Sequence, residues 1–361
     1  MKKKILIDGY FFPKPRGMGR YVQELVAAIS KNNVGDFDIL VCIPKNIEGK
    51  LLNKFPEVQF IKCPNLPFPL WEQVLVPIIA SKYKIDIVHS PYNTKSLLLD
   101  VIGIKNITTI HDLMFFDKEH KVGSNYQRIG NFYRKFIVNR FAKNKNKQNV
   151  VTVSQQSADE IQEVLLLNSK VVYTPVDFFF SNISKEYKDI IQKPYIYHVG
   201  GTSPHKNTEN VIKAFQKSKL NNFSLVISGA PKDCELEKKY ADENIIFTGW
   251  ISDDTIASLY ANSNMVVFPS LKEGYGLPII EAFKFKKPLI TSNIKPMSEI
   301  AGEAAYLINP YSINEITEAF ITLNQEDKII KQLENAASER ANQINAVYMS
   351  QQMYEIYEEI L

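Results

Sequence analysis

Residues 265–283 constrain the fold of this 361-residue chain more than any other segment. The apolar run 265–268 has the composition of a buried strand, and a turn containing Gly274 and Gly276 follows it. Pro278 then suits the first turn of a helix. A strand, a glycine loop and a helix in this order present backbone N–H groups and the positive end of a helix dipole, which favour an anion such as phosphate. The segment therefore predicts an α/β fold with an anion-binding site.

Two glutamates flank this glycine loop, with seven residues between them. Glu273 precedes the glycines, and Glu281 falls within the first turns of the predicted helix. Both carboxylates can therefore face one ligand, and a carboxylate beside a phosphate site accepts charge-assisted hydrogen bonds from neutral hydroxyls. We expect a ligand that carries phosphate groups together with ribose or sugar hydroxyls.

Strands and helices alternate along both halves of the chain. Several strand candidates are continuous apolar or β-branched runs, as in parallel strands that are buried on both faces. Helical periodicity lies between them, for example over residues 21–29 and 256–261. The predicted strands are 4–7, 39–43, 59–63, 85–89, 107–111, 150–153, 195–199, 225–228, 245–248, 265–268, 289–292 and 305–308. This pattern favours two doubly wound, Rossmann-like α/β domains.

Each half opens in the same way, with a strand, a glycine turn and a helix. The first turn contains Gly17 and Gly19, and the second contains Gly201 followed by Lys206. Glycine lets the backbone approach a ligand closely, and a helix N-terminus favours an anion. A plain tight turn and a solvated lysine are the alternative interpretations of these motifs.

The segment that holds Glu273 and Glu281 resembles the Glu-x7-Glu signature of the retaining glycosyltransferases of family four, which have the GT-B fold. The similarity extends backward through residues 247–253 and forward through residues 299–305. In that family the first glutamate lies by the donor sugar, the second holds the nucleotide ribose, and N–H groups between them hold the diphosphate. The resemblance implies two Rossmann-like domains that face a central cleft.

The resemblance also implies roles for individual residues. His111 and Asp112 match the family's His-Asp-Leu motif, and the turn at 17–21 matches a family loop. Lys206 resembles the lysine that binds the diphosphate, and it would act in catalysis with His111 and Glu273. The implied nucleotide-sugar-binding residues are Gly17, Gly19, Gly201, Lys206, Gly249, Trp250, Ser270, Glu273, Gly274, Tyr275, Gly276, Leu277 and Glu281.

Acceptor contacts are predicted in the first half of the chain. His89 and His111 end two predicted strands, where side chains of a parallel sheet face the ligand crevice. Asp112 follows His111, and Trp71 lies in an aromatic segment that we expect to be exposed. His89 is evenly balanced between a supporting role and acceptor contact, since a lone histidine is more often a satisfied structural residue.

We expect the diphosphate charge to be met without a metal ion or another cofactor. Gly201 and His205 stand where many family members carry arginine, which leaves Lys206 and backbone N–H groups to face the phosphates. Asp36 and Asp38 spell the Asp-x-Asp motif of metal-dependent transferases, but their context indicates a solvated turn. Paired His or Cys ligands at zinc spacing are absent from the sequence.

Charge is unevenly distributed along the chain. The formal net charge is +4, yet residues 1–150 carry 24 Lys and Arg against 12 Asp and Glu. Residues 118–147 hold nine of these cations and one acidic residue. The helix predicted in this segment carries on one face Ile129, Phe132, Tyr133, Phe136 and Ile137. An anionic membrane surface fits such a segment better than nucleic acid, although packing of the apolar stripe on the sheet is the favoured interpretation of the stripe itself.

The organisation follows from these observations. We expect an acceptor-binding domain over residues 1–180, a nucleotide-sugar-binding domain over 181–345, and a last helix at about 346–361 that packs back on the first domain. No run approaches about 18 uninterrupted apolar residues, and the three cysteines are scattered. We expect a cytoplasmic protein, either free or peripheral on the inner face of the plasma membrane.

The expected function rests on the resemblance. We expect a retaining hexosyltransferase that moves mannose from GDP-mannose to a hydroxyl of a lipid-linked oligosaccharide, such as a polyprenyl-diphosphate acceptor, or of another glycan in cell-surface polysaccharide synthesis. Lipopolysaccharide O-antigen is one such product. A UDP-hexose or UDP-HexNAc transferase, a sugar-nucleotide epimerase and a non-catalytic nucleotide-sugar-binding protein stay open.

Overall fold

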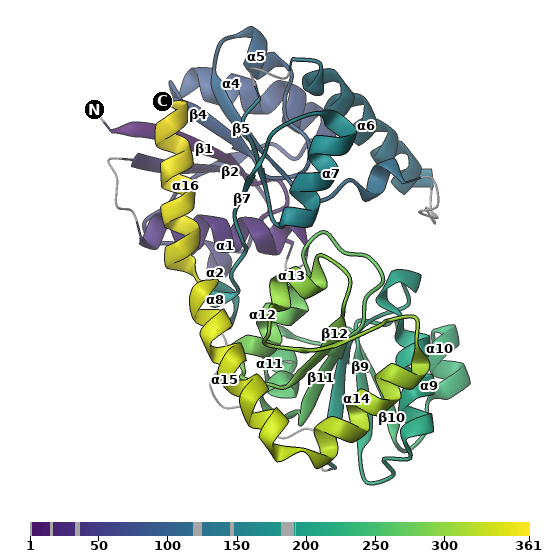
Figure 1. Ribbon diagram of the computed structural model, residues 1–361. Coiled ribbons are helices and arrows are strands. Elements are labelled where there is room, and N and C mark those ends of the chain that lie inside the picture. Colours follow the sequence, from purple (N-terminus) through teal and green to yellow (C-terminus); the bar gives the residue numbers. More distant parts are fainter. Residues whose placement is uncertain are drawn as a thin grey trace. The chain divides into compact units, whose positions relative to one another are not determined.

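The chain folds into two compact units, shown as a ribbon in Figure 1. The computed structural model describes residues 2–14, 17–32, 37–117, 125–144, 148–181, 191 and 193–361. Unit 1 comprises Met1–Phe179 and Asn345–Leu361, and unit 2 comprises Phe180–Ile344. The boundary expected from the sequence lies one residue later. The central cleft between the two units stays a prediction.

Unit 1 is built on a seven-stranded parallel sheet with the order β3-β2-β1-β4-β5-β6-β7. Its strands are β1 (Lys3–Asp8), β2 (Phe37–Pro44), β3 (Gln59–Cys63), β4 (Ile87–Ser90), β5 (Lys105–Ile110), β6 (Val150–Thr152) and β7 (Lys170–Val171). The chain proceeds outward in opposite directions from β1 and β4. The loops that follow these two strands therefore diverge, which is where open α/β sheets bind ligands.

Helices cover both faces of this sheet. They are α1 (Met18–Lys31), α2 (Gly49–Leu52), α3 (Phe68–Leu70), the π-helical turn η1 (Trp71–Leu75), α4 (Val76–Lys82), α5 (Leu98–Val101), the 3₁₀ turn η2 (Met114–Phe116), α6 (Asn125–Ala142), α7 (Gln155–Leu165), α8 (Asp177–Ser181) and α16 (Ala346–Ile360). α1 and α16 pack against each other. η1 and α4 pack on the central strands, and α6 packs with α7 around a second apolar cluster.

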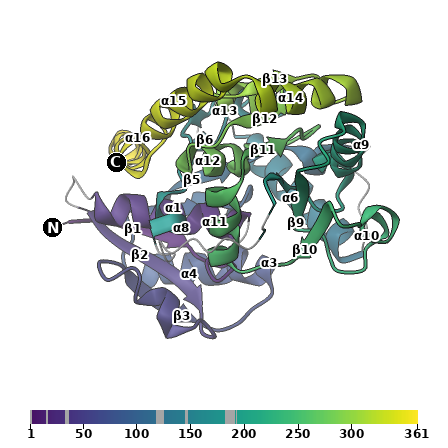
Figure 2. The same cartoon turned by 90° about the horizontal axis from the view of Figure 1, so that it is seen from below.

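Unit 2 is built on a six-stranded parallel sheet with the order β10-β9-β8-β11-β12-β13. Its strands are β8 (Tyr195–Val199), β9 (Ser224–Ser228), β10 (Ile245–Gly249), β11 (Met265–Phe268), β12 (Leu289–Ser292) and β13 (Tyr306–Ile308). Its helices are the 3₁₀ turn η4 (Pro204–Lys206), α9 (Thr208–Ser218), α10 (Glu235–Tyr240), α11 (Asp253–Asn262), α12 (Leu277–Lys284), α13 (Met297–Ala301), α14 (Ile313–Gln325) and α15 (Asp327–Gln343). α9 and α14 pack side by side over one apolar core, and Figure 2 shows α14 and α15 running along this unit. The chain again reverses direction at the centre, between β8 and β11.

The twelve strands predicted from the sequence are all present, with ends displaced by at most two residues. In the central strands the apolar side chains are buried on both faces, which explains why continuous apolar runs marked them. The edge strands β10 and β13 are less buried, and Leu307 in β13 is 40% exposed. The structure contains one further strand, β7, which has two residues, lies at the sheet edge and was not predicted from the sequence. Its first residue, Lys170, is exposed, so the strand carries no apolar signature. The prediction of two doubly wound, Rossmann-like domains is confirmed.

The last helix belongs to unit 1. Tyr357 on α16 is fully buried, and its hydroxyl lies 2.8 Å from Nδ1 of His89 on β4. The Tyr354 hydroxyl donates to the carbonyl of Ile29 on α1. The Asp177 carboxylate accepts from the N–H of Ala346 at the helix start, at 2.8 Å. These buried contacts attach residues at the end of the chain to the sheet formed at its beginning.

Candidate functional site

Unit 2 brings two of the predicted motifs together at the carboxyl ends of the neighbouring strands β8 and β11. The backbone N–H of Leu271 donates to the carbonyl of His205 at 2.7 Å. The Asn207 side-chain amide donates to the carbonyl of Pro269 at 3.2 Å. The loop after β8 and the loop after β11 are therefore held together as one structure at the reversal of strand order, where ligands of such sheets bind.

Lys206 and Glu273, predicted separately, form an ion pair in this structure. The Lys206 Nζ lies 2.6 Å from Oε1 of Glu273 and 4.9 Å from the centroid of the Phe268 ring. The two side chains are only 22% and 14% exposed. An ammonium group has three donors, so Lys206 can hold Glu273 and still donate to a phosphate. The pair carries no net charge, but it fixes the position of the Lys206 ammonium group, which has donors left for a phosphate.

Helix α12 begins as the sequence predicted, with its N-terminus at this loop. Gly276 is the N-cap with a φ of 108°, and a Cβ there would lie 3.2 Å from Cδ1 of Ile279. Pro278 occupies the first turn, where its missing N–H costs no hydrogen bond. Since glycine offers no side-chain cap, an anion can complete this helix N-terminus.

Glu281 is 3% exposed, and a buried tyrosine orients its carboxylate. The Tyr260 hydroxyl donates to Oε2 of Glu281 at 2.7 Å, and Tyr260 itself is fully buried. A carboxylate has lone pairs beyond those of one contact, so it can accept further hydroxyl donors. The hydroxyl of Ser270 is also buried and has no hydrogen-bond partner within the described residues. Ser270 follows β11 and Glu281 lies in α12, so both side chains offer polar atoms to a ligand at the N-terminus of α12.

The remaining predicted residues of unit 2 lie at the carboxyl ends of β8, β10 and β11. Gly201 has a φ of 97°, and a Cβ there would lie 3.0 Å from the carbonyl oxygen of Gly229. Gly249 has a φ of 70°. Trp250 is 60% exposed, so burial in the core does not account for a tryptophan at this position. Gly274, Tyr275 and Leu277 complete the loop and the start of α12.

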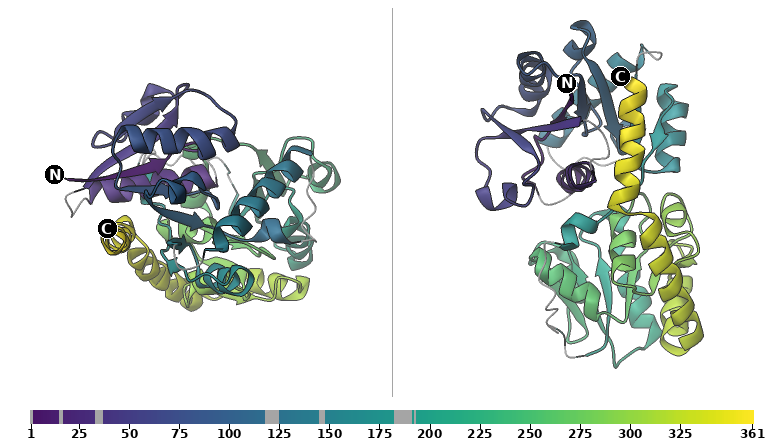
Figure 3. Two further views of the ribbon diagram at one scale, coloured as in Figure 1. Left: turned by 90° about the horizontal axis from the view of Figure 1, so that it is seen from above. Right: turned by 90° about the vertical axis from the view of Figure 1, so that its left-hand side faces the viewer.

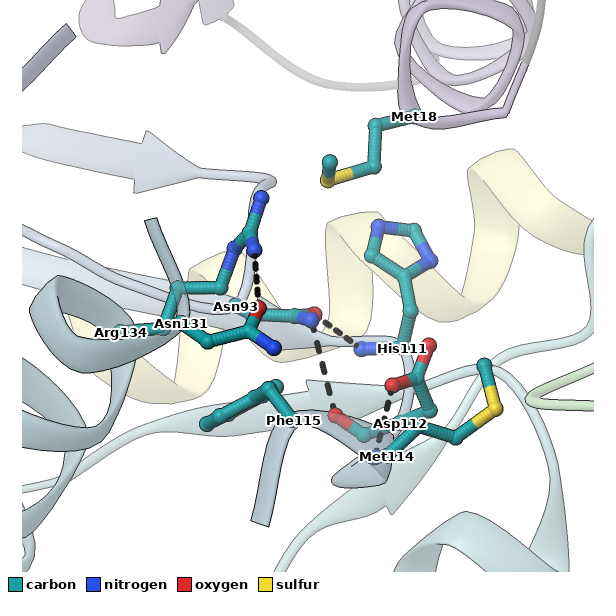
Figure 4. A pocket seen from close by; sticks show the side chains of 8 residues that line it. All are labelled: Met18, Asn93, His111, Asp112, Met114, Phe115, Asn131 and Arg134. Atoms are coloured by element: carbon teal, nitrogen blue, oxygen red, sulfur yellow. Dashed lines mark hydrogen bonds between the residues drawn. The ribbon is translucent and has the colours of Figure 1, made fainter. Parts of the chain in front are cut away.

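Unit 1 contains a second cluster around a cavity of about 180 Å³ (Figure 4). Met18 at the start of α1 lines it together with His111 and Asp112, which follow β5. Asn131 and Arg134 on α6 also line it. The other lining residues are Asn93, Met114 and Phe115. The glycine turn and the His-Asp segment therefore meet, whereas Asn131 and Arg134 were not predicted for this site.

His111 is held in one position and protonation state. Its backbone N–H donates to Oδ1 of Asn93 at 2.7 Å, and its Nε2 lies 2.9 Å from the carbonyl of Pro91. Nε2 must therefore carry a proton, because a carbonyl only accepts. Burial lowers the pKa of His111 to about 4, so the ring is neutral near pH 7 and its Nδ1 has a lone pair. The ring edge contacts Tyr21, with centroids 4.6 Å apart.

The glycine turn before α1 has a steric cause. Gly17 has a φ of 53°, which favours glycine. A Cβ on Gly19 would lie 2.0 Å from the carbonyl oxygen of Lys14 and 2.4 Å from that of Phe11. Only glycine allows the loop to pack on the helix this closely, and this packing sets the position of Met18 at the cavity.

The prediction that Trp71 is exposed and contacts the acceptor is wrong. Trp71 is fully buried, and its indole N–H donates to Oδ1 of Asp8 at 2.8 Å. The reason is the π-helical turn η1, which the sequence did not indicate. Burial raises the pKa of Asp8 to about 6, and the Trp71 hydrogen bond opposes that rise. The exposed positions of the segment are instead Leu70 and Val74.

The acceptor role expected for His89 is also corrected. His89 is fully buried, with Nδ1 2.8 Å from the Tyr357 hydroxyl and Nε2 2.7 Å from the Thr109 hydroxyl. Burial lowers its pKa to about 3. Both ring nitrogens are used by the protein, so His89 joins α16 to the sheet. Asp112, in contrast, does line the cavity, and its Oδ1 accepts from the N–H of Met114 at 3.0 Å.

The favoured packing of the apolar stripe on α6 holds only in part. Ile137 is 3% exposed and belongs to the core with Phe141. Ile129, Phe132 and Phe136 are 70%, 73% and 56% exposed. The helix is oriented so that Val138 and Phe141, which were not part of the expected stripe, pack into the core. Three of the five stripe residues are therefore exposed to solvent.

No helix in the described parts of the chain is long and apolar enough to cross a membrane. The same described residues contain no group of three or more His, Cys, Asp or Glu side chains that could hold a metal ion. Asp38 lies in β2 with an exposed side chain rather than in a turn, and Asp36 lies outside the described residues.

Two family models match the chain. "Glycosyltransferase Family 4" matches residues 15–178, and "Glycosyl transferases group 1" matches residues 180–342. Together they match most of both units and all of the candidate site residues, but neither β1 nor α16.

Curated relatives match at lower coverage. The serotype-specific mannosyltransferase WbdA of Escherichia coli is 28% identical over 252 residues, which is 63% of this chain and 30% of WbdA. The chain thus spans less than a third of the length of that relative. The O-antigen chain mannosyltransferase RfbU of Salmonella typhimurium is 26% identical over 63% of each chain.

Solved structures match the whole fold. A glycosyltransferase from Rickettsia africae has a TM-score of 0.73 and 18% identity, and the match covers 99% of this chain and 98% of that one. Anabaena Alr3699/HepE, solved in complex with UDP and glucose, also has a TM-score of 0.73 and 18% identity, over 99% of this chain and all of that one.

Proposed function

Because this chain belongs to the family 4 glycosyltransferases of GT-B fold, we propose that it transfers a sugar from a nucleotide-diphosphate donor to an acceptor hydroxyl, with retention of configuration. The observation that carries the proposal is the Lys206–Glu273 ion pair beside the N-terminus of α12. A fixed cation and a helix N-terminus side by side suit a diphosphate, and Glu281 beyond them suits the ribose hydroxyls.

The proposed chemistry breaks one bond and forms one. The bond from the anomeric carbon to the diphosphate breaks, the acceptor oxygen bonds to the same face of that carbon, and the acceptor proton passes to the departing phosphate oxygen. Lys206 and the α12 N–H groups stabilise the charge that develops on the diphosphate. We propose that this positive charge makes a metal ion unnecessary.

His111 would act on the sugar or the acceptor rather than on the phosphate. Its neutral ring offers the Nδ1 lone pair to a hydroxyl, while the Pro91 carbonyl holds Nε2–H. Orientation of a hydroxyl is the contribution that such a fixed acceptor makes. This role requires the proposed central cleft to bring His111 of unit 1 to the donor held by unit 2.

The donor sugar is proposed from the relatives. WbdA and RfbU, both described as mannosyltransferases, support mannose from GDP-mannose. The HepE complex with UDP and glucose supports the alternative of a UDP-hexose or UDP-HexNAc donor. The O-antigen description of RfbU supports a lipid-linked oligosaccharide or glycan acceptor in surface polysaccharide synthesis, and such an acceptor fits a protein at the inner face of the plasma membrane.

A thermal-shift panel of GDP-, UDP- and dTDP-sugars tests the donor, since a ligand that binds the native state raises its apparent stability. We expect GDP-mannose to give the largest shift. The matching transfer assay should release nucleoside diphosphate only when acceptor is added, both with and without EDTA. Release without acceptor would favour an epimerase or hydrolase, no release would favour a binding protein, and activity that needs Mn²⁺ or Mg²⁺ would overturn metal independence.

A further inference from the structure

Arg134 brings into the cavity of unit 1 a positive charge that none of the predicted site residues explains. It lies on α6, is half-buried and lines the cavity together with His111. Its guanidinium donates to Oδ1 of Asn131 at 3.0 Å. In the described part of the chain, no carboxylate pairs with it. A charge that is partly removed from water is unfavourable unless an opposite charge compensates it, so the cavity offers a cation to an anionic ligand.

Two asparagines add hydrogen-bond donors to this cation. An arginine only donates, so the Asn131 atom that it meets must be the amide oxygen, and the NH₂ group of Asn131 is left for a ligand. The same reasoning applies to Asn93, whose Oδ1 accepts from the N–H of His111 at 2.7 Å. The NH₂ group of Asn93 has only a long contact, at 3.5 Å, to the carbonyl of Asp112. The arginine and both asparagines therefore offer donors to the cavity that they line.

The other polar groups of the cavity leave room for an anion beside Arg134. Asp112 is the acidic residue that lines the cavity, and its Oδ1 accepts from the N–H of Met114 at 3.0 Å. The ring of His111 is neutral, with a lone pair on Nδ1. Figure 4 shows the Arg134 guanidinium and the His111 ring facing the same space below Met18. An anionic group in this space would meet the guanidinium, while a neighbouring hydroxyl donates to Nδ1.

We propose that this cavity binds an acceptor sugar that carries an oxyanion, either a carboxylate or a phosphate ester, with the anion at Arg134 and a hydroxyl at His111. This inference names the acceptor class within the proposed function, on which it rests. The planar fork of a guanidinium matches the oxygens of either anion. The cavity holds about 180 Å³, less than the roughly 300–1,000 Å³ of pockets that enclose a whole small ligand. It therefore suits one sugar ring of the acceptor together with its charged substituent.

Arg134 would act as a specificity-determining residue. A neutral acceptor leaves the guanidinium without a partner, and a site that loses a polar partner discriminates strongly against such a ligand. Arg134 can be changed without disturbing the helix that closes unit 1, because α6 and α16 lie on opposite sides of this unit (Figure 1 and the left view of Figure 3). The role of Arg134 can therefore be tested separately from the stability of the domain.

The test measures binding of matched sugars to the full chain without nucleotide. The probes are methyl glycosides of the gluco, galacto and manno series, each as the neutral sugar, the uronic acid and the 6-phosphate. Titrations are followed by NMR of protein with labelled histidine, and the ring signals of His111 locate binding at the cavity. We expect an anionic sugar to bind more tightly than its neutral partner. Arg134→Gln should weaken binding of this sugar by roughly tenfold to a hundredfold, as for loss of a hydrogen bond between charged groups, and leave the neutral sugar unaffected. Arg134→Lys keeps the charge without the fork, so its loss should be smaller.

The matched control is Arg140→Gln, which removes the same charge from an exposed position of α6 that does not line the cavity. It should bind every probe like the wild type. Equal affinity for anionic and neutral sugars in all three series, or equal losses in the Arg134 and Arg140 variants, would overturn the proposal. So would a loss of GDP and UDP affinity in Arg134→Gln with unchanged binding of the anionic sugar, because Arg134 would then serve the donor.

Sugar transfer is scored separately, so that the two proposals can fail independently. Binding that prefers the anionic sugar and depends on Arg134, in a protein that transfers no sugar, would support the anion site and contradict the proposed function. Transfer to neutral acceptors with the same kcat/KM in wild type and Arg134→Gln, and no preference for anionic ones, would support the function and overturn the anion site. The tighter of the uronic acid and the 6-phosphate identifies the anion.

Discussion

At the scale of single residues, two histidines of similar sequence context have different roles. Both follow apolar strand residues of unit 1, and burial lowers the pKa of each. His89 uses both ring nitrogens within the protein, whereas His111 uses Nε2 for the Pro91 carbonyl and lines a cavity. The number of ring nitrogens that the protein itself occupies therefore separates a structural histidine from a candidate site residue.

Glu281→Ala should weaken binding of the free nucleoside diphosphate by about 1.5–3 kcal/mol, the value of a hydrogen bond to a charged group. Calorimetric titration measures it. Tyr260→Phe is the control, since it keeps the carboxylate and removes only the hydroxyl that orients it at 2.7 Å, so its loss should be smaller. Equal affinity of wild type and Glu281→Ala would show that Glu281 does not hold the ribose.

Glu72→Gln should change how stability depends on pH. Burial raises the pKa of Glu72 from 4.5 to about 7, so between these values the folded state holds more protons than the unfolded state. The contribution of Glu72 to the free energy of unfolding therefore falls as pH rises, by up to about 1.4 kcal/mol per pH unit. The variant lacks this term, so its stability relative to wild type should increase from pH 5 to pH 7.

Urea unfolding of both proteins at several pH values measures this difference. Other titrating groups are shared by the two proteins and cancel in the comparison. Asp86→Asn is a suitable control, because the pKa of Asp86 is lowered rather than raised and its effect lies at more acidic pH. A constant difference between Glu72→Gln and wild type from pH 5 to pH 7 would contradict the prediction.

At the scale of elements, glycine turns and helix faces decide what each segment can do. The N-terminus of α12 lies beside the loop that holds the Lys206–Glu273 ion pair, because Gly276 adopts a φ that other residues avoid. α6 divides its surface between a core face, a cavity face and an exposed apolar face. An amphipathic pattern gives one apolar side, but the neighbouring α7 and the loop after β5 determine which apolar residues become buried.

Gly276→Ala should lower diphosphate affinity and stability together. The φ of 108° costs an L-residue on the order of 1–2 kcal/mol, and relief of this strain would shift the start of α12. Gly103→Ala is the matched control, with a φ of 74° and open space around the new Cβ. It should lose similar stability in urea unfolding and keep wild-type affinity. An unaltered diphosphate affinity in Gly276→Ala would remove α12 from the binding site.

At the scale of the whole molecule, the chain repeats one design and then returns to its beginning. Each unit is a parallel sheet whose strand order reverses at the centre, and most candidate residues lie at or beside this reversal, whereas Gly249 and Trp250 lie at the end of the edge strand β10. The last helix closes unit 1, because Tyr357 and Met353 are fully buried in it. Residues 345–361 therefore contribute to the stability of a domain that begins more than three hundred residues earlier.

Tyr357→Ala should destabilise the protein by about 3–5 kcal/mol, the usual cost of deleting a buried aromatic ring. Tyr357→Phe keeps the ring and removes only the hydroxyl that meets His89, so it should cost about 1–3 kcal/mol. Urea unfolding followed by tyrosine fluorescence and circular dichroism measures both. A loss below about 1 kcal/mol in Tyr357→Ala would mean that α16 is not needed to close unit 1.

The sequence alone determined the strands, the reversal-point loops and the family. Apolar β-branched runs mark strands that are buried on both faces, and glycines at a positive φ or at a close approach mark loops, because both signals are local. Glu273, Gly276 and Glu281 were found for that reason, whereas Lys206 was found through the resemblance to the family. Short elements without such a signal, such as β7 and the π-helical turn η1, were missed.

The tertiary structure alone decided which polar side chains are free for a ligand. Trp71 and His89 carry the residue types of a binding site, but Asp8, Thr109 and Tyr357, all distant in sequence, satisfy them inside the core. It also decided that Phe132 and Phe136 stay in solvent while Phe141 does not. Burial depends on which elements pack together across the whole chain, and no local pattern contains that information.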